Sequence, residues 1–149
     1  MDETISDSPV PWVADHIRRF VETGGNPRPG SNDLLLTTRG RRSGKLRRTV
    51  LVYAVDGDRY VVAASAAGAD RHPAWYLNLV ADPDVTVQVG PRTIPAVART
   101  ATVAERPRLW QMMIAMMPSY QEYRRATTRE IPLVILEPRL PASPYRQKV

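Results

Sequence analysis

Residues 34–62 read LLLTTRGRRSGKLRRTVLVYAVDGDRYVV, and this stretch decides the fold because it holds runs of strand-forming residues separated by two turns. The runs at 34–38, 49–55 and 60–65 predict three strands. Asp56-Gly57-Asp58 predicts a tight hairpin between the second and third, since Asp-Gly tolerates the positive φ angles of such turns. Short strands joined by tight turns favour an antiparallel meander or barrel over a parallel sheet.

The regions on either side of this stretch add helices and more strands. The apolar residues Val13, Ile17, Phe20 and Val21 recur at helical spacing, which predicts an amphipathic helix that ends at Gly24-Gly25. We expect further strands at 85–89, 94–103 and 131–136, and further helices at 72–81, 106–117 and 119–126.

Domain boundaries follow from these elements. Ser119 is a candidate cap for the last helix, and residues 137–149, with three prolines, predict an extended arm. The expected organisation is an N-terminal helix and loop at 1–33, one barrel domain at 34–138 and a tail at 139–149. The fold class is α+β, mainly β with helices.

Composition limits the class of protein. The 149 residues contain no cysteine, which excludes disulfides and thiolate metal sites. The acidic start of the chain does not resemble a signal peptide, and no window approaches the roughly 18 apolar residues of a spanning helix. We therefore expect a cytoplasmic protein that is soluble or at most associated with a membrane surface.

The net charge of +6 is concentrated in one place. Ten consecutive residues, 39–48, contain six basic side chains and no acid, which predicts an anionic partner: nucleic acid, an acidic membrane surface or a phosphorylated small molecule. Gly40, Ser43 and Gly44, with Arg41 and Arg42, suit a phosphate because backbone N–H groups and arginines donate charge-assisted hydrogen bonds. The alternative is a solvated hairpin tip.

Two aromatic segments could form a binding site. Trp75 and Tyr76 could wall a planar ring, with Ser65 or Asn78 as hydrogen-bond donors; the alternative is that Trp75 belongs to the core.

The second aromatic pair follows the helix break at Pro118. Tyr120 and Tyr123 share a helix face, and a tyrosine can donate a proton; ordinary packing is the alternative. His72 and His16 are the two histidines, too few for a histidine metal site.

Three segments, in this order and spacing, resemble the deazaflavin-dependent nitroreductase and F420H2-dependent quinone reductase group. They are TTRGRRSGKLRRTVL (37–51), VVAASAAGADRHPAWYLNLVADPDVTVQV (61–89) and MPSYQEYRRATTREIPLVILEP (117–138). The resemblance implies a split β-barrel of about six antiparallel strands, like that of pyridoxamine oxidases. It also implies use of reduced coenzyme F420, an 8-hydroxy-5-deazaflavin with a phosphate and an oligoglutamate tail.

The resemblance also implies roles for individual residues. The phosphate and tail would be held by Arg41, Arg42, Ser43, Gly44 and Arg47. The ring would be flanked by Ser65, Ala66, Ala74 and Trp75. Tyr120, Tyr123 and Ser65 would be catalytic, facing the substrate.

The chain departs from the family pattern at three positions. Relatives often carry lysine at Ala66 and tyrosine at Met117, and tend to carry proline at Val50. Arg71 or Arg48 could replace the missing lysine as a phosphate contact.

The resulting functional hypothesis is hydride transfer from reduced F420 to a flat, electron-poor acceptor such as a quinone, with nitroaromatics as adventitious substrates. The alternatives are an FMN-dependent enzyme of the same barrel class and an anion-binding module for nucleic acid or a membrane surface. The N-terminal helix, with Trp12 and Phe20, could contact a membrane, cover the pocket or simply pack on the barrel. A homodimer is a candidate assembly, as in relatives of this barrel class.

Overall fold

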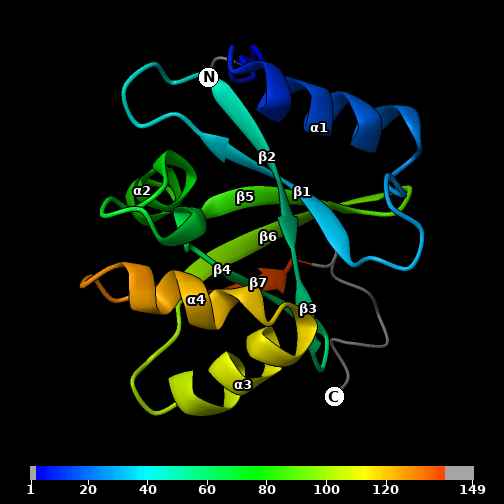
Figure 1. The fold of residues 1–149 in the computed structure, drawn as a ribbon. Coiled ribbons are helices and arrows are strands. Elements are labelled where there is room, and N and C mark those ends of the chain that lie inside the picture. Colours follow the sequence, from blue (N-terminus) through cyan, green and yellow to red (C-terminus); the bar gives the residue numbers. More distant parts are fainter. Residues whose placement is uncertain (1–2, 140–149) are drawn as a thin grey trace, which may run out of the picture.

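The computed structural model describes residues 3–139, and Figure 1 shows a curled sheet with helices around it. Within these residues the strands are β1 (Asp33–Arg39), β2 (Leu46–Val52), β3 (Ala54–Asp56), β4 (Arg59–Ala63), β5 (Asp84–Val89), β6 (Arg92–Thr100) and β7 (Leu133–Pro138). The helices are α1 (Pro11–Glu22), the short 3-10 helix η1 (Ala66–Gly68), α2 (Ala74–Ala81), α3 (Arg106–Met116) and α4 (Ser119–Ala126). Glu137 and Pro138, predicted to begin the extended arm, are the last residues of β7 and pair with β6; the rest of the predicted arm, beyond residue 139, lies outside the described residues.

All strands belong to one antiparallel sheet in the order β2-β1-β5-β6-β7-β4-β3. The two outermost strands, β2 and β3, are separated in sequence by Tyr53 alone. A flat sheet would place these strands far apart, so the sheet must curl until its two ends meet at Tyr53. This confirms the predicted α+β fold and antiparallel split barrel.

The described sheet has seven strands rather than about six because the expected strand 49–55 is divided at Tyr53. β2 pairs with β1, and this ladder ends where Val52 faces Asp33, the first residue of β1. The Tyr53 N–H instead donates to the Asn32 carbonyl at 3.0 Å, and β3 then pairs with β4. The strand is divided because its partner changes, which no local sequence feature signals.

The two predicted turns are present. Residues 40–45 join β1 to β2, with the Gly40 N–H donating to the Lys45 carbonyl at 2.7 Å. Gly57 adopts φ +65° in the β3–β4 hairpin, as the Asp-Gly pair predicts. β2 begins at Leu46 rather than residue 49 because Arg47 and Arg48 pair in register with Thr38 and Thr37.

Two helix starts differ from expectation. Ser119 does not cap α4: Pro118 takes the N-cap position without a side-chain hydrogen bond, and Ser119 is the first helical residue. α2 begins at Ala74 because Pro73 has extended backbone angles and takes the cap position.

Strand β1 is buried on both faces, which explains its uninterrupted LLL run. Leu34 and Leu36 point into the barrel core, whereas Leu35 packs with Ile17 and Phe20 of α1. A third apolar cluster joins α3 and α4 to β4 and β7, with Leu109, Met113, Tyr120, Leu133 and Ile135 among its members. α1 and α4 are thus fixed to different parts of the barrel.

The first described residues lie along the exposed edge of β2. Ile5 forms a parallel bridge with Leu46, and the Leu46 N–H donates to the Thr4 carbonyl at 2.8 Å. This N-terminal strap (residues 3–7) therefore runs beside the basic turn.

Candidate functional site

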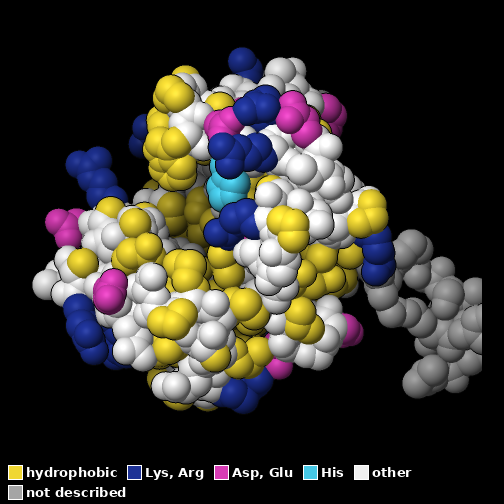
Figure 2. Space-filling view, turned by 45° about the vertical axis from the view of Figure 1, so that its right-hand side comes forward, with side chains coloured by type: hydrophobic (Ala, Val, Ile, Leu, Met, Phe, Trp, Pro, Cys, Tyr) yellow, Lys and Arg dark blue, Asp and Glu magenta, His cyan; other side chains and the backbone are white. Residues whose placement is uncertain are grey.

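A largely apolar cavity of about 640 Å³ lies between α1, β2, the loop after β4 and α4. Figure 2 shows a hollow with hydrophobic side chains on its walls and a histidine and basic residues near its rim. The residues that line it are Trp12, Val13, His16, Thr49, Val50, Leu51, Val52, Ala63, Ser65, Ala66, Ala67, Pro73, Trp75, Met117, Tyr120 and Tyr123. It can accept a flat apolar molecule and offers it a few polar groups.

Of the two aromatic pairs predicted to form the site, Trp75, Tyr120 and Tyr123 line this cavity. Tyr76 does not: it packs against the barrel core, and its hydroxyl lies 2.9 Å from Thr100 Oγ1. Tyr120 and Tyr123 contact each other edge to face, with ring centroids 6.1 Å apart. Burial, with Tyr123 nearby, raises the pKa of Tyr120 to about 12, so its hydroxyl keeps its proton at neutral pH. Trp75 lines the cavity and also packs against the barrel core, so the functional and structural interpretations both hold.

Two cationic cavities lie next to one another at the start of α2. The larger, about 540 Å³, is lined by Arg41, Arg42, Asp70, Arg71, His72, Ala74, Leu77 and Arg129. The smaller, about 280 Å³, is lined by Gly40, Arg41, Arg42, Ser43, Arg47, Ala74 and Asn78. Ala74 therefore borders the cationic cavities, whereas its neighbour Trp75 borders the apolar one.

The six basic residues of segment 39–48 differ in their partners. Arg48 donates to both carboxylate oxygens of Asp7, at 2.9 and 2.5 Å, and Arg39 pairs with Glu3 at 3.2 Å. Among residues 3–139, no carboxylate pairs with Arg41 or Arg42. Of the two arginines expected to replace the lysine of relatives, Arg48 is engaged with Asp7, whereas Arg71 lines the larger cationic cavity.

Asn78 holds the basic turn in place and does not line the apolar cavity. Its buried Oδ1 accepts from the Arg41 backbone N–H at 3.2 Å and from Arg41 Nη1 at 3.1 Å. Its Nδ2 donates to Thr38 Oγ1 at 3.2 Å. Sequence reasoning missed this role because it depends on contact between residues 37 positions apart.

No cluster of three or more metal-ligating side chains of the His, Cys, Asp and Glu types occurs among the residues described. No helix among them is long and apolar enough to cross a bilayer.

Comparison with known proteins identifies the family. The family model of F420H(2)-dependent quinone reductases matches residues 12–138. The chain belongs to this family. An F420H(2)-dependent quinone reductase of Mycobacterium tuberculosis (strain H37Rv) is 40% identical over 116 residues, covering 75% of this chain and 78% of the relative.

Solved structures agree with membership of the F420H(2)-dependent quinone reductase family. An F420-H2 dependent reductase has 37% identity and a TM-score of 0.66, covering 71% of this chain and 94% of its own. A chain described as a domain-swapped dimer has 36% identity and a TM-score of 0.69, covering 87% of this chain and 100% of its own.

A pyridoxamine 5′-phosphate oxidase-type structure from Listeria innocua shares the fold. It has 11% identity and a TM-score of 0.51, covering 85% of this chain and 93% of its own. The pyridoxamine-oxidase-like barrel implied by the sequence is therefore confirmed.

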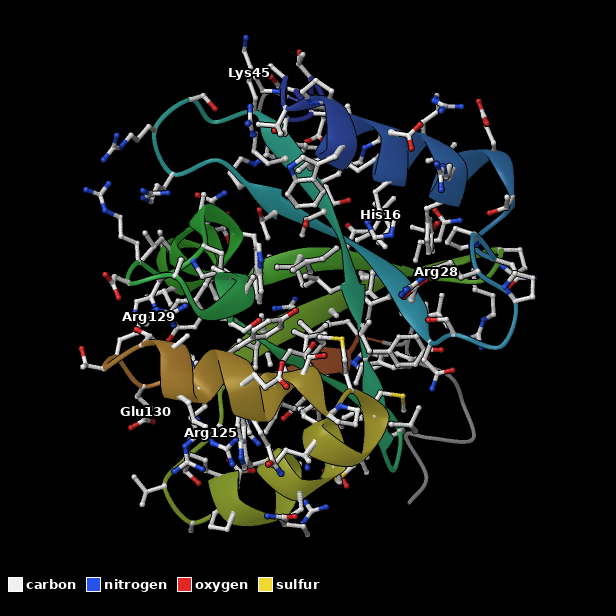
Figure 3. All side chains as sticks on the ribbon, in the orientation of Figure 1. His16, Arg28, Lys45, Arg125, Arg129 and Glu130 are labelled. Atoms are coloured by element: carbon white, nitrogen blue, oxygen red, sulfur yellow. The ribbon has the colours of Figure 1, made fainter. Side chains whose placement is uncertain are left out.

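His16 is a cavity residue that the sequence interpretation did not place in the site. Figure 3 shows it on the side of α1 that faces the sheet. Burial lowers the pKa of its imidazole, an effect that Arg28 and Arg19 reinforce and that Asp33 and Asp15 oppose. The sequence does hold a signal for this placement: His16 follows Trp12 by four residues, so the two side chains lie on the same face of α1.

We expect His16 to titrate below the ordinary histidine pKa of about 6.5. The His16 imidazole then binds a proton more readily in the unfolded chain than in the folded one. Protonation therefore favours unfolding, and the fold loses stability as the pH falls below about 6.5. A two-dimensional NMR titration measures the midpoint, and His72→Asn assigns the two imidazole signals. A His16 midpoint at or above about 6.5 would contradict the expected effect of burial.

Proposed function

We propose that this protein reduces a quinone with reduced coenzyme F420 as the hydride donor. The observation that supports this most directly is the adjacency of the cationic and apolar cavities on either side of Ala74 and Trp75. A coenzyme with a flat ring and an anionic tail requires these two environments side by side. The family and the named relatives agree with this assignment.

The residues present suit the two parts of the coenzyme. Arg41, Arg42 and Arg47, with Ser43 and the backbone at Gly40, would bind the phosphate and the first carboxylates. Gly44, also expected at this site, lines neither cationic cavity and donates its N–H to the Gly40 carbonyl at 2.8 Å. A Cβ at Gly40 would lie 2.7 Å from Ser43 Oγ and 3.1 Å from the Lys45 carbonyl oxygen, so a side chain there would displace the Ser43 hydroxyl.

The ring would lie in the apolar cavity against Trp75, with Ser65 and Ala66 beside it. When bound, the coenzyme supplies the hydride.

The protein's own contribution is orientation, exclusion of water and a proton donor. Trp75 and α1 limit where a flat acceptor can lie in the apolar cavity, which favours close approach to the ring. The protonated Tyr120 hydroxyl would donate to the acceptor oxygen that gains negative charge, with Tyr123 and Ser65 as further donors. Met117, where relatives often carry tyrosine, leaves one wall of the cavity apolar.

The proposal is tested by mixing the pure protein with reduced F420 and menadione without oxygen and following loss of the reduced coenzyme. We expect turnover with the quinone, and slower turnover with a nitroaromatic. No turnover together with tight FMN binding would favour the FMN-dependent alternative. Salt-sensitive DNA or lipid binding, with no affinity for either coenzyme, would favour the anion-binding alternative.

Replacing Tyr120 by phenylalanine is expected to lower kcat about tenfold, because one neutral hydrogen bond to the acceptor oxygen is lost. Coenzyme affinity should not change, since the coenzyme's anionic groups bind the arginines. Tyr60→Phe is a matched control, because Tyr60 packs against the barrel core and lies outside the cavity lining. An unchanged kcat in Tyr120→Phe would assign the proton to another donor.

Two further proposals concern assembly and location. We propose that the protein forms a homodimer, supported by the relative described as a domain-swapped dimer; light scattering should give twice the monomer mass. We also propose that α1 contacts a membrane surface, which the exposed Trp12 supports; Phe20, the second residue expected in this contact, is fully buried against the barrel and cannot take part.

A further inference from the structure

The cavity wall between β4 and α2 has an unfavourable backbone conformation. Ala66 and Ala67 both adopt left-handed backbone angles, with φ of 47° and 53°. Residues other than glycine rarely adopt these angles, and they persist only where the surroundings hold them. Both alanines line the apolar cavity together with Ser65, so this left-handed turn (residues 65–69) shapes the proposed ring site.

The Arg129 guanidinium ties the two ends of this turn together. On the near side, Nη2 donates to the Ser65 carbonyl at 2.6 Å and Nη1 donates to the Ala64 carbonyl at 3.2 Å. On the far side, Nε donates to the Ala69 carbonyl at 2.7 Å. Three carbonyls around one planar group require the fork geometry of arginine, which a lysine ammonium cannot reproduce.

The turn that Arg129 binds also packs against α4, the helix that carries the two cavity tyrosines. Figure 3 shows Arg129 between the end of α4 and the loop that leads to α2. Gly68, in the turn, lies so close to α4 that a Cβ there would be 2.9 Å from both Ala126 Cβ and the Tyr123 carbonyl. Two cavity walls that are far apart in sequence therefore meet beside one side chain.

We propose that Arg129 is the positioning residue of the ring site. It holds the left-handed turn so that Ser65, Ala66 and Ala67 present a fixed wall to the deazaflavin ring. This inference rests on the proposed function for the identity of the ring, but the restraint on the turn does not depend on it. The same guanidinium lines the larger cationic cavity, so its charge offers a competing explanation that the test must separate.

The test uses two probes and separates the effect of the guanidinium geometry of Arg129 from the effect of its positive charge. The probes are the complete coenzyme and its 8-hydroxy-5-deazaflavin ring with the ribityl chain alone, both titrated by fluorescence. Arg129→Lys keeps the charge and loses the fork, so we expect it to weaken binding of both probes about tenfold. Arg41→Gln with Arg42→Gln should weaken only the complete coenzyme, since the ring fragment has no anionic tail.

Arg125→Lys is the matched control, because Arg125 is an exposed arginine on α4 outside both the apolar and the cationic cavities. If Arg129→Lys bound the ring fragment with wild-type affinity, the positioning role would be overturned, and Arg129 would act only through its positive charge.

Hydrogen exchange separates failure of this inference from failure of the proposed function. In Arg129→Lys, the backbone amides of residues 65–70 should lose protection even without coenzyme, whereas those of β5 and β6 should not change. If the variant does not fold, NMR of the wild type provides the measurement: the Arg129 Nε–H should exchange slowly and that of Arg125 fast. Fast exchange at Arg129 Nε–H would contradict the proposal.

Discussion

Replacing Arg41, Arg42 and Arg47 together by glutamine is expected to weaken binding of coenzyme F420 by two to three orders of magnitude. Hydrogen bonds between charged groups contribute about 1.5–3 kcal/mol each, and each 1.4 kcal/mol is a factor of about ten in affinity. The three side chains border the same small cavity, so their effects will not simply add. Fluorescence titration measures the affinity, and circular dichroism checks the fold.

The control for this experiment removes the same charge from a different surface. Arg92→Gln, Arg124→Gln and Arg125→Gln combined lower the net charge equally, and all three residues are exposed and lie outside both cationic cavities. We expect at most a small loss of affinity, which added salt should abolish. Unchanged affinity in a folded Arg41, Arg42 and Arg47 triple variant would remove the basis of the proposed binding mode.

Replacing Phe20 by alanine is expected to lower the free energy of unfolding by about 3–5 kcal/mol, the usual cost of removing a buried aromatic ring. Phe20 of α1 is fully buried against Leu35 and Val50 of the barrel, so it fixes α1 to the barrel. Because α1 supplies Trp12 and His16 to the apolar cavity, acceptor affinity should also fall. Urea denaturation measures the stability, and the quinone KM measures the effect on the acceptor.

Val21→Ala is the matched control, since Val21 follows Phe20 on the same helix and is about half exposed. A surface substitution of this kind changes stability by about 0.5 kcal/mol or less. If the two variants unfolded at the same urea concentration, α1 would not be fixed through Phe20, and the assignment of α1 as a cavity wall would need revision.

The sequence predicted the elements whose signals are local. The Asp-Gly hairpin, the basic turn and the apolar spacing of α1 each depend on neighbouring residues, and each is present. The division of the strand at Tyr53 could not be predicted, because it reflects where β1 ends rather than any property of Tyr53. The residue pattern predicts a strand from residue 49, whereas β2 begins at Leu46, because the basic residues Arg47 and Arg48 also fit the ladder with β1.

The same distinction applies to the candidate site. Ser65, Trp75, Tyr120 and Tyr123 were selected by residue type and position, and the structure brings them into one cavity. Their catalytic and binding roles remain predictions.

Asn78 and Arg129 could not be assigned in this way. Their partners lie 37 and about 60 residues away in sequence, and a single chain gives no sign of such pairs.

The N-terminal strap has a practical consequence for experiments on shortened forms of the protein. Glu3 and Asp7 supply carboxylates to Arg39 and Arg48, so deleting residues 1–8 would take two counter-charges from the basic segment 39–48. The trimmed protein would then attract heparin, DNA and other polyanions more strongly through unspecific counterion release. Such retention on a column would reflect a lost intramolecular neutralisation, and would say nothing about a natural nucleic-acid ligand.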